Sequence, residues 1–291
     1  MKTNTQFRAH LTTHLAESLR AARRDYRRRL KRCRKQFSEQ AVHDLRVEKR
    51  RLLALLDLLE AAHFAGAPGR ARKILKQRLD AFDELRDTQV HLQLLKPLWP
   101  EFPEAKPLRK LLQRHEQRLI KKTRKKVLGT RPGQLTRKLK ELEQQICGIS
   151  TSKRKKDDQR IAITTLRDSF DRVVGLRRRI RGVDPAAIHE MRVAFKRFRY
   201  MSELLQPFLP WLTKERIRRM RKFQGSAGDV QDLEILLAKL DQFVQEKEVP
   251  AATLEQLRSE LSRRKEQALD FFMERIDDLL EFQPAETAHK N

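Results

Sequence analysis

Two segments of the chain repeat one spacing of histidine and cationic side chains. Residues 42–51 read VHDLRVEKRR and residues 188–197 read IHEMRVAFKR, 146 positions later. At about 100° per residue of helix, the histidine and two following cations fall within about 60° of one another. These residues are His43, Arg46 and Arg50 in the first segment, and His189, Arg192 and Lys196 in the second. Such rows of charge-assisted donors predict a ligand with many negative charges.

Other cationic side chains continue these rows or form similar ones. They are Arg51, Arg197 and Arg199 beside the two motifs, Arg20, Arg24 and Arg27, then Arg114, Arg118 and Lys121, and finally Arg218. The alternative is that each row is an ordinary solvated helix face. A solvated face usually mixes signs, with Glu four residues before Lys. Because these rows are nearly free of acids, their neighbouring charges repel, and together they favour an absent anionic partner.

The two histidines each precede an acidic residue, Asp44 or Glu190. A lone histidine on a helix is more often structural, but its recurrence on a cationic face favours ligand binding. Nearby cations keep such an imidazole neutral near pH 7, and a bound polyanion raises its pKa. The histidines therefore predict an affinity that rises from pH 8 to pH 6, where Arg and Lys ordinarily do not titrate.

A second repeated feature is an aspartate on a later helix. Leu85-Arg86-Asp87-Thr88-Gln89-Val90 matches Val230-Gln231-Asp232-Leu233-Glu234-Ile235 at an offset of 145. Asp87 and Asp232 could orient the arginine rows or hold a metal, although two isolated carboxylates make a poor metal site. The interpretation that we favour is a buried aspartate bonded to an arginine or to a helix end.

The elements that position these residues are predicted to be helices. Gly and Pro number only nine and eleven, and they cluster between long segments with a 3.6-residue apolar period. No stretch alternates convincingly as a strand, so the fold class is all-α. The expected helices lie near 5–36, 40–64, 70–96, 104–128, 132–147, 159–181, 186–206, 210–244 and 251–281.

Each motif helix has an apolar face opposite its cations. In the first copy this face holds Leu45, Leu52, Leu55, Leu56 and Leu59, and in the second it holds Met191, Phe195, Phe198 and Leu205. The offsets of 146 and 145 predict an internal duplication with about four helices per unit, a pattern typical of up-down bundles. We expect one domain made of repeat units 5–147 and 159–282, a polar linker 148–158 and a tail 283–291.

The amino-acid composition favours some functional classes over others. Lys and Arg number 66 against 39 Asp and Glu, a net charge of +27, and residues 1–150 alone carry 37 basic and 16 acidic residues. Such an excess of positive charge is typical of proteins that bind polyanions. Two cysteines, Cys33 and Cys147, offer no disulfide framework or metal-ligand spacing, which fits a reducing cytoplasm.

Signals for other classes are missing from the sequence. The N-terminus lacks the apolar stretch of a signal peptide, and the longest apolar run, Leu52 to Leu59, contains Asp57 and is too short for a membrane span. There is no Walker-type loop, His-Glu-x-x-His motif or nucleophile elbow. We therefore expect no membrane association, no metal, no cofactor and no catalytic residue.

The two histidine segments, Val42 through Arg51 and Ile188 through Tyr200, resemble the conserved-histidine α-helical domain family, known as CHAD. Leu85-Arg86-Asp87 and Gly228-Asp229-Val230-Gln231-Asp232 resemble that family's second signature. The resemblance covers about residues 5 to 282. Its departures are small: Leu53 stands where the second copy has Arg199, and Lys49 stands where it has Phe195.

This resemblance implies two four-helix-bundle-like units related by pseudo-two-fold symmetry around a basic groove or pore. It also implies binding of inorganic polyphosphate, with association at polyphosphate granules, Arg and Lys as donors to phosphoryl oxygens, and His as a pH-tuned donor. Two other classes stay open. One is a nucleic-acid-binding or ribosome-associated protein, with nucleic acid as a secondary partner. The other is an enzyme of polyphosphate hydrolysis or phosphotransfer that uses His43 or His189.

Overall fold

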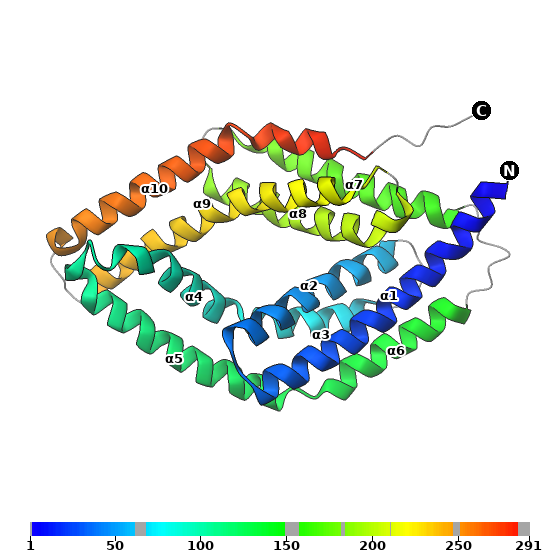
Figure 1. The fold of residues 1–291 in the computed structure, drawn as a ribbon, viewed down its shortest axis with the longest axis horizontal. Helices are drawn as coiled ribbons and strands as arrows, with labels where there is room; N and C mark the ends of the chain where they lie inside the picture. Colours follow the sequence, from blue (N-terminus) through cyan, green and yellow to red (C-terminus); the bar gives the residue numbers. More distant parts are fainter. Residues whose placement is uncertain are drawn as a thin grey trace.

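The computed structural model describes residues 2–61, 68–148, 157–181, 184–209, 211–246 and 251–284. Within these ranges the regular elements are all helical and no strand occurs, which confirms the all-α prediction (Figure 1). The α helices are α1 (Lys2–Lys35), α2 (Glu39–Ala61), α3 (Pro68–Asp80), α4 (Asp83–Leu95), α5 (Lys106–Gly129), α6 (Pro132–Gly148), α7 (Asp157–Arg179), α8 (Pro185–Leu205), α9 (Lys214–Glu246) and α10 (Glu255–Met273).

Short 3₁₀ turns join or extend several of these helices. They are η1 (Lys96–Leu98), η2 (Pro103–Ala105), η3 (Gln206–Phe208), η4 (Ala251–Leu254) and η5 (Ile276–Phe282). The helix predicted over 251–281 is therefore three elements, η4, α10 and η5. None of the helices in the described ranges is long and apolar enough to cross a bilayer.

The single helix predicted over 70–96 is wrong, because the chain breaks between α3 and α4. Neither Gly nor Pro marks the break at Ala81 and Phe82. Phe82 is buried, and the ammonium group of Lys49 on α2 lies 3.9 Å from the centre of its ring. Lys49 also donates to the carbonyl of Arg78, 2.6 Å away, in the last turn of α3. The bend directs α4 toward α5 and α9.

The two halves of the chain make similar contacts in the same order. In the first half α1 packs on α2 and α6, and α2 packs on α3; in the second, α7 packs on α8 and η5, and α8 packs on α9. Two junctions connect the halves: α2 lies against α8 and α7, and α4 lies against α9 (Figure 1). The internal duplication itself stays a prediction.

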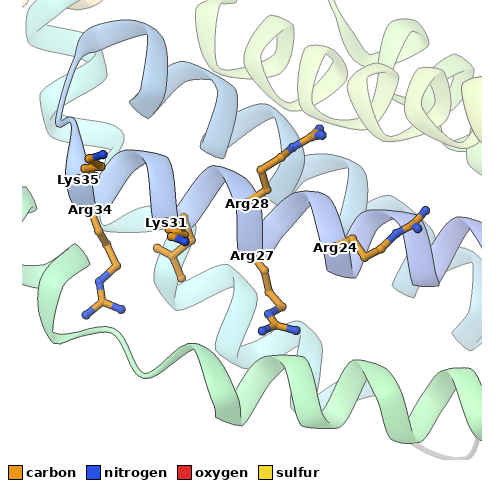
Figure 2. A pocket seen from close by; sticks show the side chains of 7 residues that line it. Arg24, Arg27, Arg28, Lys31, Arg34 and Lys35 are labelled. Carbon is orange, nitrogen blue, oxygen red and sulfur yellow. The ribbon is translucent and has the colours of Figure 1, made fainter.

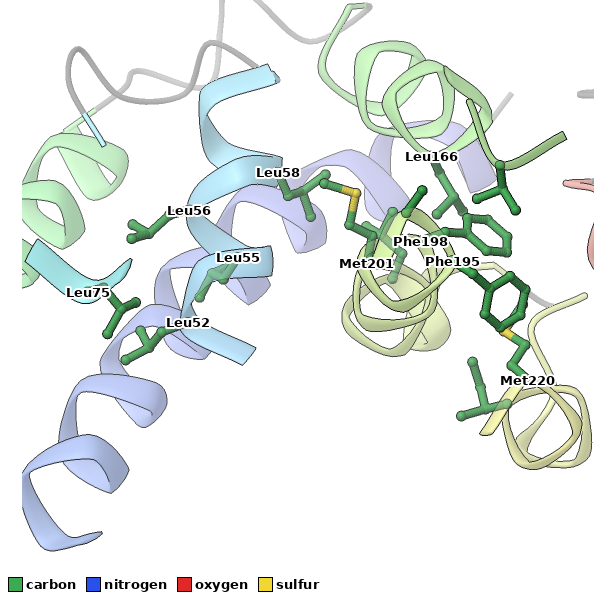
Figure 3. Packing of buried hydrophobic residues seen from close by; sticks show 14 of the residues in the cluster. Leu52, Leu55, Leu56, Leu58, Leu75, Leu166, Phe195, Phe198, Met201 and Met220 are labelled. Carbon is green, nitrogen blue, oxygen red and sulfur yellow. The ribbon is translucent and has the colours of Figure 1, made fainter. Parts of the chain in front are cut away.

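The main hydrophobic core runs through both halves. All nine apolar residues predicted to lie opposite the cations are buried. Leu58 of α2 and Met201 of α8 point toward one another where the two motif helices meet (Figure 3). A second, smaller core joins α4 and α5 to α9 and α10, with Leu95, Leu108, Leu236 and Leu257 among its buried residues. Each core therefore draws residues from both halves and fixes one of the two junctions.

Candidate functional site

Both motif helices begin with a capping residue in the same register. Ser38 Oγ accepts a hydrogen bond from the amide of Ala41 at 3.2 Å before α2. Asp184 Oδ1 accepts from the amides of Ala186 and Ala187 before α8, at 3.0 and 3.1 Å. Such caps satisfy amides that have no partner within the helix. Since Ser38 and Asp184 are 146 positions apart, both histidines and their cations take the same place relative to a helix start.

Cations of the two motifs meet at the junction of α2 and α8. We name as the central cationic cluster Arg46 and Arg50 of α2 together with Arg192, Lys196 and Arg199 of α8. Burial holds the pKa of Lys196 at about 7, helped by Arg50, Arg192, Arg199 and Arg46 in that order. Burial also lowers the pKa of Arg50, with Arg46 the largest charge acting on it. Like charges from both copies of the motif therefore share one partly desolvated region.

Three members of the cluster have no acidic counterpart close by. Within the described ranges no carboxylate lies within ion-pair distance of Arg50, Arg192 or Lys196. The Nε of Arg192 is buried without a hydrogen-bond partner in the described part of the structure. Burying cations without partners is costly. These three groups are the members of the cluster that an anionic ligand could bind without competing with a described carboxylate.

Arg46 departs from the exposure that its helix face predicts. It is 4% exposed, and its Nη1 donates to Asp83 Oδ1 of α4 at 2.7 Å. The sequence places Arg46 opposite the apolar stripe, but α4 returns over this face after the break at Phe82. Arg46 is therefore an arginine with an internal partner, and a ligand would compete with Asp83 for it.

Arg199 is also buried, at 6% exposed. Its Nε donates to Gln224 Oε1 at 2.8 Å, and its Nη1 contacts Glu203. The guanidinium carbon lies 4.1 Å from the centre of the Tyr200 ring. These contacts fix the guanidinium group of Arg199 between α8 and α9, and its positive charge acts on the cluster from there.

The two repeated aspartates face this region from the α4–α9 junction. Burial raises the pKa of Asp87, and the neighbouring Asp83 adds to the effect while Arg46 opposes it. Burial likewise raises the pKa of Asp232, against the opposing charge of Arg192. The charge of Asp87 also raises the pKa of Asp232 across the junction. Among the described residues neither Asp87 nor Asp232 makes the predicted bond to an arginine, and the hydrogen bond to Arg46 is made by Asp83 instead.

The histidines flank the cluster and are exposed. Partial burial of its ring, followed by the charge of Arg86, lowers the pKa of His43, so this imidazole is mainly neutral at pH 7. His189 hydrogen-bonds through Nδ1 to Gln231 Oε1 of α9. Gln231 belongs to the second signature, so this contact connects the two repeated motifs of the second half.

Other predicted site residues lie elsewhere. Arg197 pairs with Asp57 of α2 at 3.0 Å and joins the halves. Arg51 is exposed on the side of Glu48, away from the cluster. Arg20 pairs with Glu143 of α6 at 2.6 Å, and Arg218 with Glu215 at 2.8 Å. Arg114, Arg118 and Lys121 are exposed on α5.

A separate cationic surface lies on α1. Leu30 and six cations line a hollow of about 750 Å³: Arg24, Arg27, Arg28, Lys31, Arg34 and Lys35. Arg27 and Arg34 extend toward the connection between α5 and α6, and Arg28 extends on the other side of α1 (Figure 2). Arg34 donates to the carbonyl of Leu128 at 3.0 Å. The predicted residues Arg24 and Arg27 thus belong to a second surface.

Asp83 and Gln224 contact the central cationic cluster, but nothing in a single sequence predicts this. Gly228 is different, because a glycine inside a predicted helix is itself a signal. It lies inside α9, and a Cβ at this position would come 3.2 Å from Nη2 of Arg192. A glycine in the interior of a helix costs about 1 kcal/mol relative to alanine, so it indicates a close approach. The approach here is that of the Arg192 guanidinium to the backbone of α9.

Replacing Gly228 by Ala is expected to displace Arg192 without removing a charge. The unfolding free energy should stay level or rise by up to about 1 kcal/mol, because alanine favours the helix. Affinity for a polyanion should fall roughly two- to fivefold, equivalent to about 0.4–1 kcal/mol. Chemical denaturation and a binding titration measure these opposite effects. An affinity equal to that of the wild type would show that the position of Arg192 does not matter.

Comparison with known proteins identifies the family. The CHAD domain profile matches residues 17–241 and 166–279. A solved CHAD domain from the plant Ricinus communis is 19% identical and superposes with a TM-score of 0.68, covering 93% of this chain and 89% of that one. PptA from Streptomyces chartreusis is 18% identical with a TM-score of 0.68, covering 90% of this chain and 98% of that one. No match was found among curated protein sequences. With its profile match over most of the chain, the protein belongs to the CHAD domain family.

Proposed function

We propose that the protein is a binding module for inorganic polyphosphate that acts in the cytoplasm at polyphosphate granules. The observation that supports this most is the meeting of cations from both motif helices at the α2–α8 junction, where no carboxylate of the described residues pairs with Arg50, Arg192 or Lys196. A chain of phosphoryl groups offers negative oxygens to all of these donors at once. The exposed cations of α1 and α5 provide further contacts as the chain extends beyond the junction.

The competing proposal is a nucleic-acid-binding protein that uses the same cations. Proteins that bind single strands stack bases on exposed aromatic rings. The aromatic rings of α8 are already engaged: Tyr200 is buried beside Arg199, while Phe195 and Phe198 pack in the core. This favours a ligand that is recognised by its charge alone. Polyphosphate is such a ligand, because it has no bases to stack.

We propose further that binding is not accompanied by turnover. As acid or nucleophile, a histidine needs an orienting partner and a free nitrogen near the reacting phosphorus. Gln231 orients the ring of His189 through Nδ1, but an amide does not stabilise an imidazolium as the carboxylate partner of a catalytic histidine does. Incubation with polyphosphate and Mg²⁺, followed by measurement of released phosphate, is expected to show no catalytic rate. Phosphate release that is abolished by His43→Gln or His189→Gln would establish the enzyme instead.

The affinity for polyphosphate is expected to fall steeply with salt. Binding that neutralises several phosphates releases counterions, so the logarithm of affinity falls linearly with that of salt concentration. Four to six contacts would lower affinity by roughly 10²–10³ between 50 and 200 mM salt on the scale known for nucleic acids. Titrations at several salt concentrations give the slope, and an affinity that stays constant would contradict an electrostatic site.

Affinity is also expected to rise as pH falls from 8 to 6, and Lys196 is a main cause. The sequence makes histidine the main candidate for this range, but Lys196 has a pKa of about 7 among Arg50 and Arg46 of α2 and Arg192 and Arg199 of α8. Asp83 pairs with Arg46, and Tyr200 and Asp83 both act on Arg50. A bound anion favours the ammonium form of Lys196. Above pH 7 the free protein must therefore take up a proton in order to bind, which reduces the binding free energy by up to about 1.4 kcal/mol per pH unit.

The variant Lys196→Arg separates these contributions. Because arginine stays charged, the variant is expected to bind more tightly than the wild type at pH 8 and equally at pH 6. The matched variant with His43→Gln and His189→Gln should keep the part of the pH dependence that Lys196 provides. If Lys196→Arg retains the full pH dependence and the histidine variant loses it, the histidines alone control binding.

A further inference from the structure

Of the two equivalent motif residues Arg50 and Lys196, only the lysine can lose its proton near neutral pH. It stands at the position of the second motif that Arg50 occupies in the first, 146 residues earlier. An arginine stays protonated in proteins, whereas a lysine loses its proton readily when it is buried or placed near other cations. The second copy therefore carries an amine where the first carries a permanent cation.

The surroundings of this amine come from three helices. Arg192 and Arg199 lie on its own helix α8, Arg46 and Arg50 face it from α2, and Asp83 of α4 is paired with Arg46. Lys196 itself is half-buried, and none of the described carboxylates lies within ion-pair distance of its ammonium group. Burial and these four guanidinium groups lower its pKa to about 7, so the neutral amine is accessible near neutral pH.

A neutral lysine amine is a nucleophile, and a neighbouring cation is one of the ways in which proteins activate it. The same guanidinium groups are suited to hold a phosphate. An electrophile that carries a phosphate as its leaving group would bring its reacting carbon to the amine while the arginines hold its phosphoryl oxygens. Acyl phosphates have this structure, with a carbonyl carbon bonded through oxygen to phosphorus.

We propose that Lys196 is a site of covalent acylation by acyl phosphates, whose phosphoryl group is held by Arg50 and Arg192. The lone pair of Nζ attacks the carbonyl carbon and forms a C–N bond. The bond from that carbon to the bridging oxygen breaks, and inorganic phosphate leaves with the electron pair. The nitrogen loses a proton to the departing phosphate or to water, so the products are an amide and phosphate.

Acylation would change the charge of the cluster. The amide is neutral at every pH, so one of the cations of the α2–α8 junction is lost. If the proposed polyphosphate function holds, acylated protein binds polyphosphate more weakly, and bound polyphosphate protects Lys196 by covering it and by keeping it protonated. The reactivity of Lys196 itself does not depend on that function.

The test uses the full chain and acetyl phosphate as the probe. After timed incubation the protein is digested with chymotrypsin, and acetylation is quantified by mass spectrometry at Lys196 and at Lys121, which is exposed on α5. At pH 7.5 an amine of pKa 7 is neutral about 700 times more often than an ordinary lysine. Its lower basicity reduces nucleophilicity about 50-fold at the Brønsted slope known for thiols. Lys196 should therefore react about tenfold faster, before any gain from holding the phosphate.

The first test is the pH dependence of the acetylation rates of Lys196 and Lys121 in the wild-type protein. The rate at Lys196 should level off above about pH 7.5, whereas the rate at Lys121 should keep rising to pH 9. Rates that rise in parallel, or a slower reaction at Lys196, would overturn the proposal. This measurement needs no variant, so it holds even where a substitution disturbs folding.

The role of the arginines is tested by a second reagent and a variant. Acetic anhydride has no phosphate, so the preference for Lys196 over Lys121 should be smaller with it than with acetyl phosphate. Arg50→Gln should slow acetylation of Lys196 by acetyl phosphate, while the matched change Lys73→Gln on α3 should leave it unchanged. An equal preference with both reagents would show that the cluster does not hold the phosphoryl group and would refute this part of the proposal.

Discussion

Replacing Arg50 and Lys196 together by glutamine is expected to lower the affinity for polyphosphate by about 10²–10⁴-fold. Each charge-assisted contact is worth about 1.5–3 kcal/mol when it is well formed, and the two losses convert to this range at about 1.4 kcal/mol per factor of ten. Helical content should persist, because neither side chain has a carboxylate partner in the described part of the chain. The unfolding free energy should rise, since burial and neighbouring cations lower the pKa of both groups.

A matched pair of substitutions controls for the loss of net charge. Lys73 and Lys76 are exposed on α3, so Lys73→Gln with Lys76→Gln removes the same charge away from the central cationic cluster. This variant should bind almost as tightly as the wild type at moderate salt. Equal weakening by both pairs, measured by titration under identical conditions, would mean that only the overall charge of the protein matters.

The largest loss of stability is expected for Phe195→Ala. The Phe195 ring is 1% exposed, and its centre lies 4.7 Å from that of Phe223, 5.7 Å from that of Phe282 and 6.0 Å from that of Phe198. Removing such a ring leaves a cavity, and we expect a loss of about 3–5 kcal/mol of unfolding free energy. Chemical denaturation measures this loss.

Val193→Ala, two residues away and 49% exposed, is the control and should change the unfolding free energy by less than about 0.5 kcal/mol. A loss below about 1 kcal/mol for Phe195→Ala would contradict the packing of α8 against α9 and η5. Because α8 carries Arg192 and Lys196, the same variant should also weaken polyphosphate binding as this packing loosens.

The helices and their buried faces could be predicted because their signal is local. The 3.6-residue period places Leu52 and Leu59, or Phe195 and Phe198, on one side of a helix, and the structure buries all four. The break at Phe82 could not be predicted, because it depends on Lys49 of another helix and not on Gly or Pro. Lys49 itself stands at the position of Phe195 in the other copy, and the first half buries it at 2% exposed.

For the candidate site, the sequence predicts residues more readily than their arrangement. The repeat identifies His43, Arg50, Arg192 and Lys196 as members of equivalent faces, but helix periodicity cannot tell that these two polar faces meet. That contact depends on long-range packing, as does the burial of Arg46 by Asp83. One signal was available, since Asp57 interrupts an apolar run, and the structure pairs it with Arg197 across the junction.

A competition titration tests the central claim most directly. Labelled long-chain polyphosphate, RNA and DNA are titrated with the protein at one salt concentration, and each complex is then challenged with the other unlabelled polymers. We predict that polyphosphate binds most tightly and displaces RNA, while RNA fails to displace polyphosphate at an equal concentration of phosphate groups. RNA or DNA that binds as tightly as polyphosphate, or that displaces it, would contradict the proposal of a polyphosphate-binding protein.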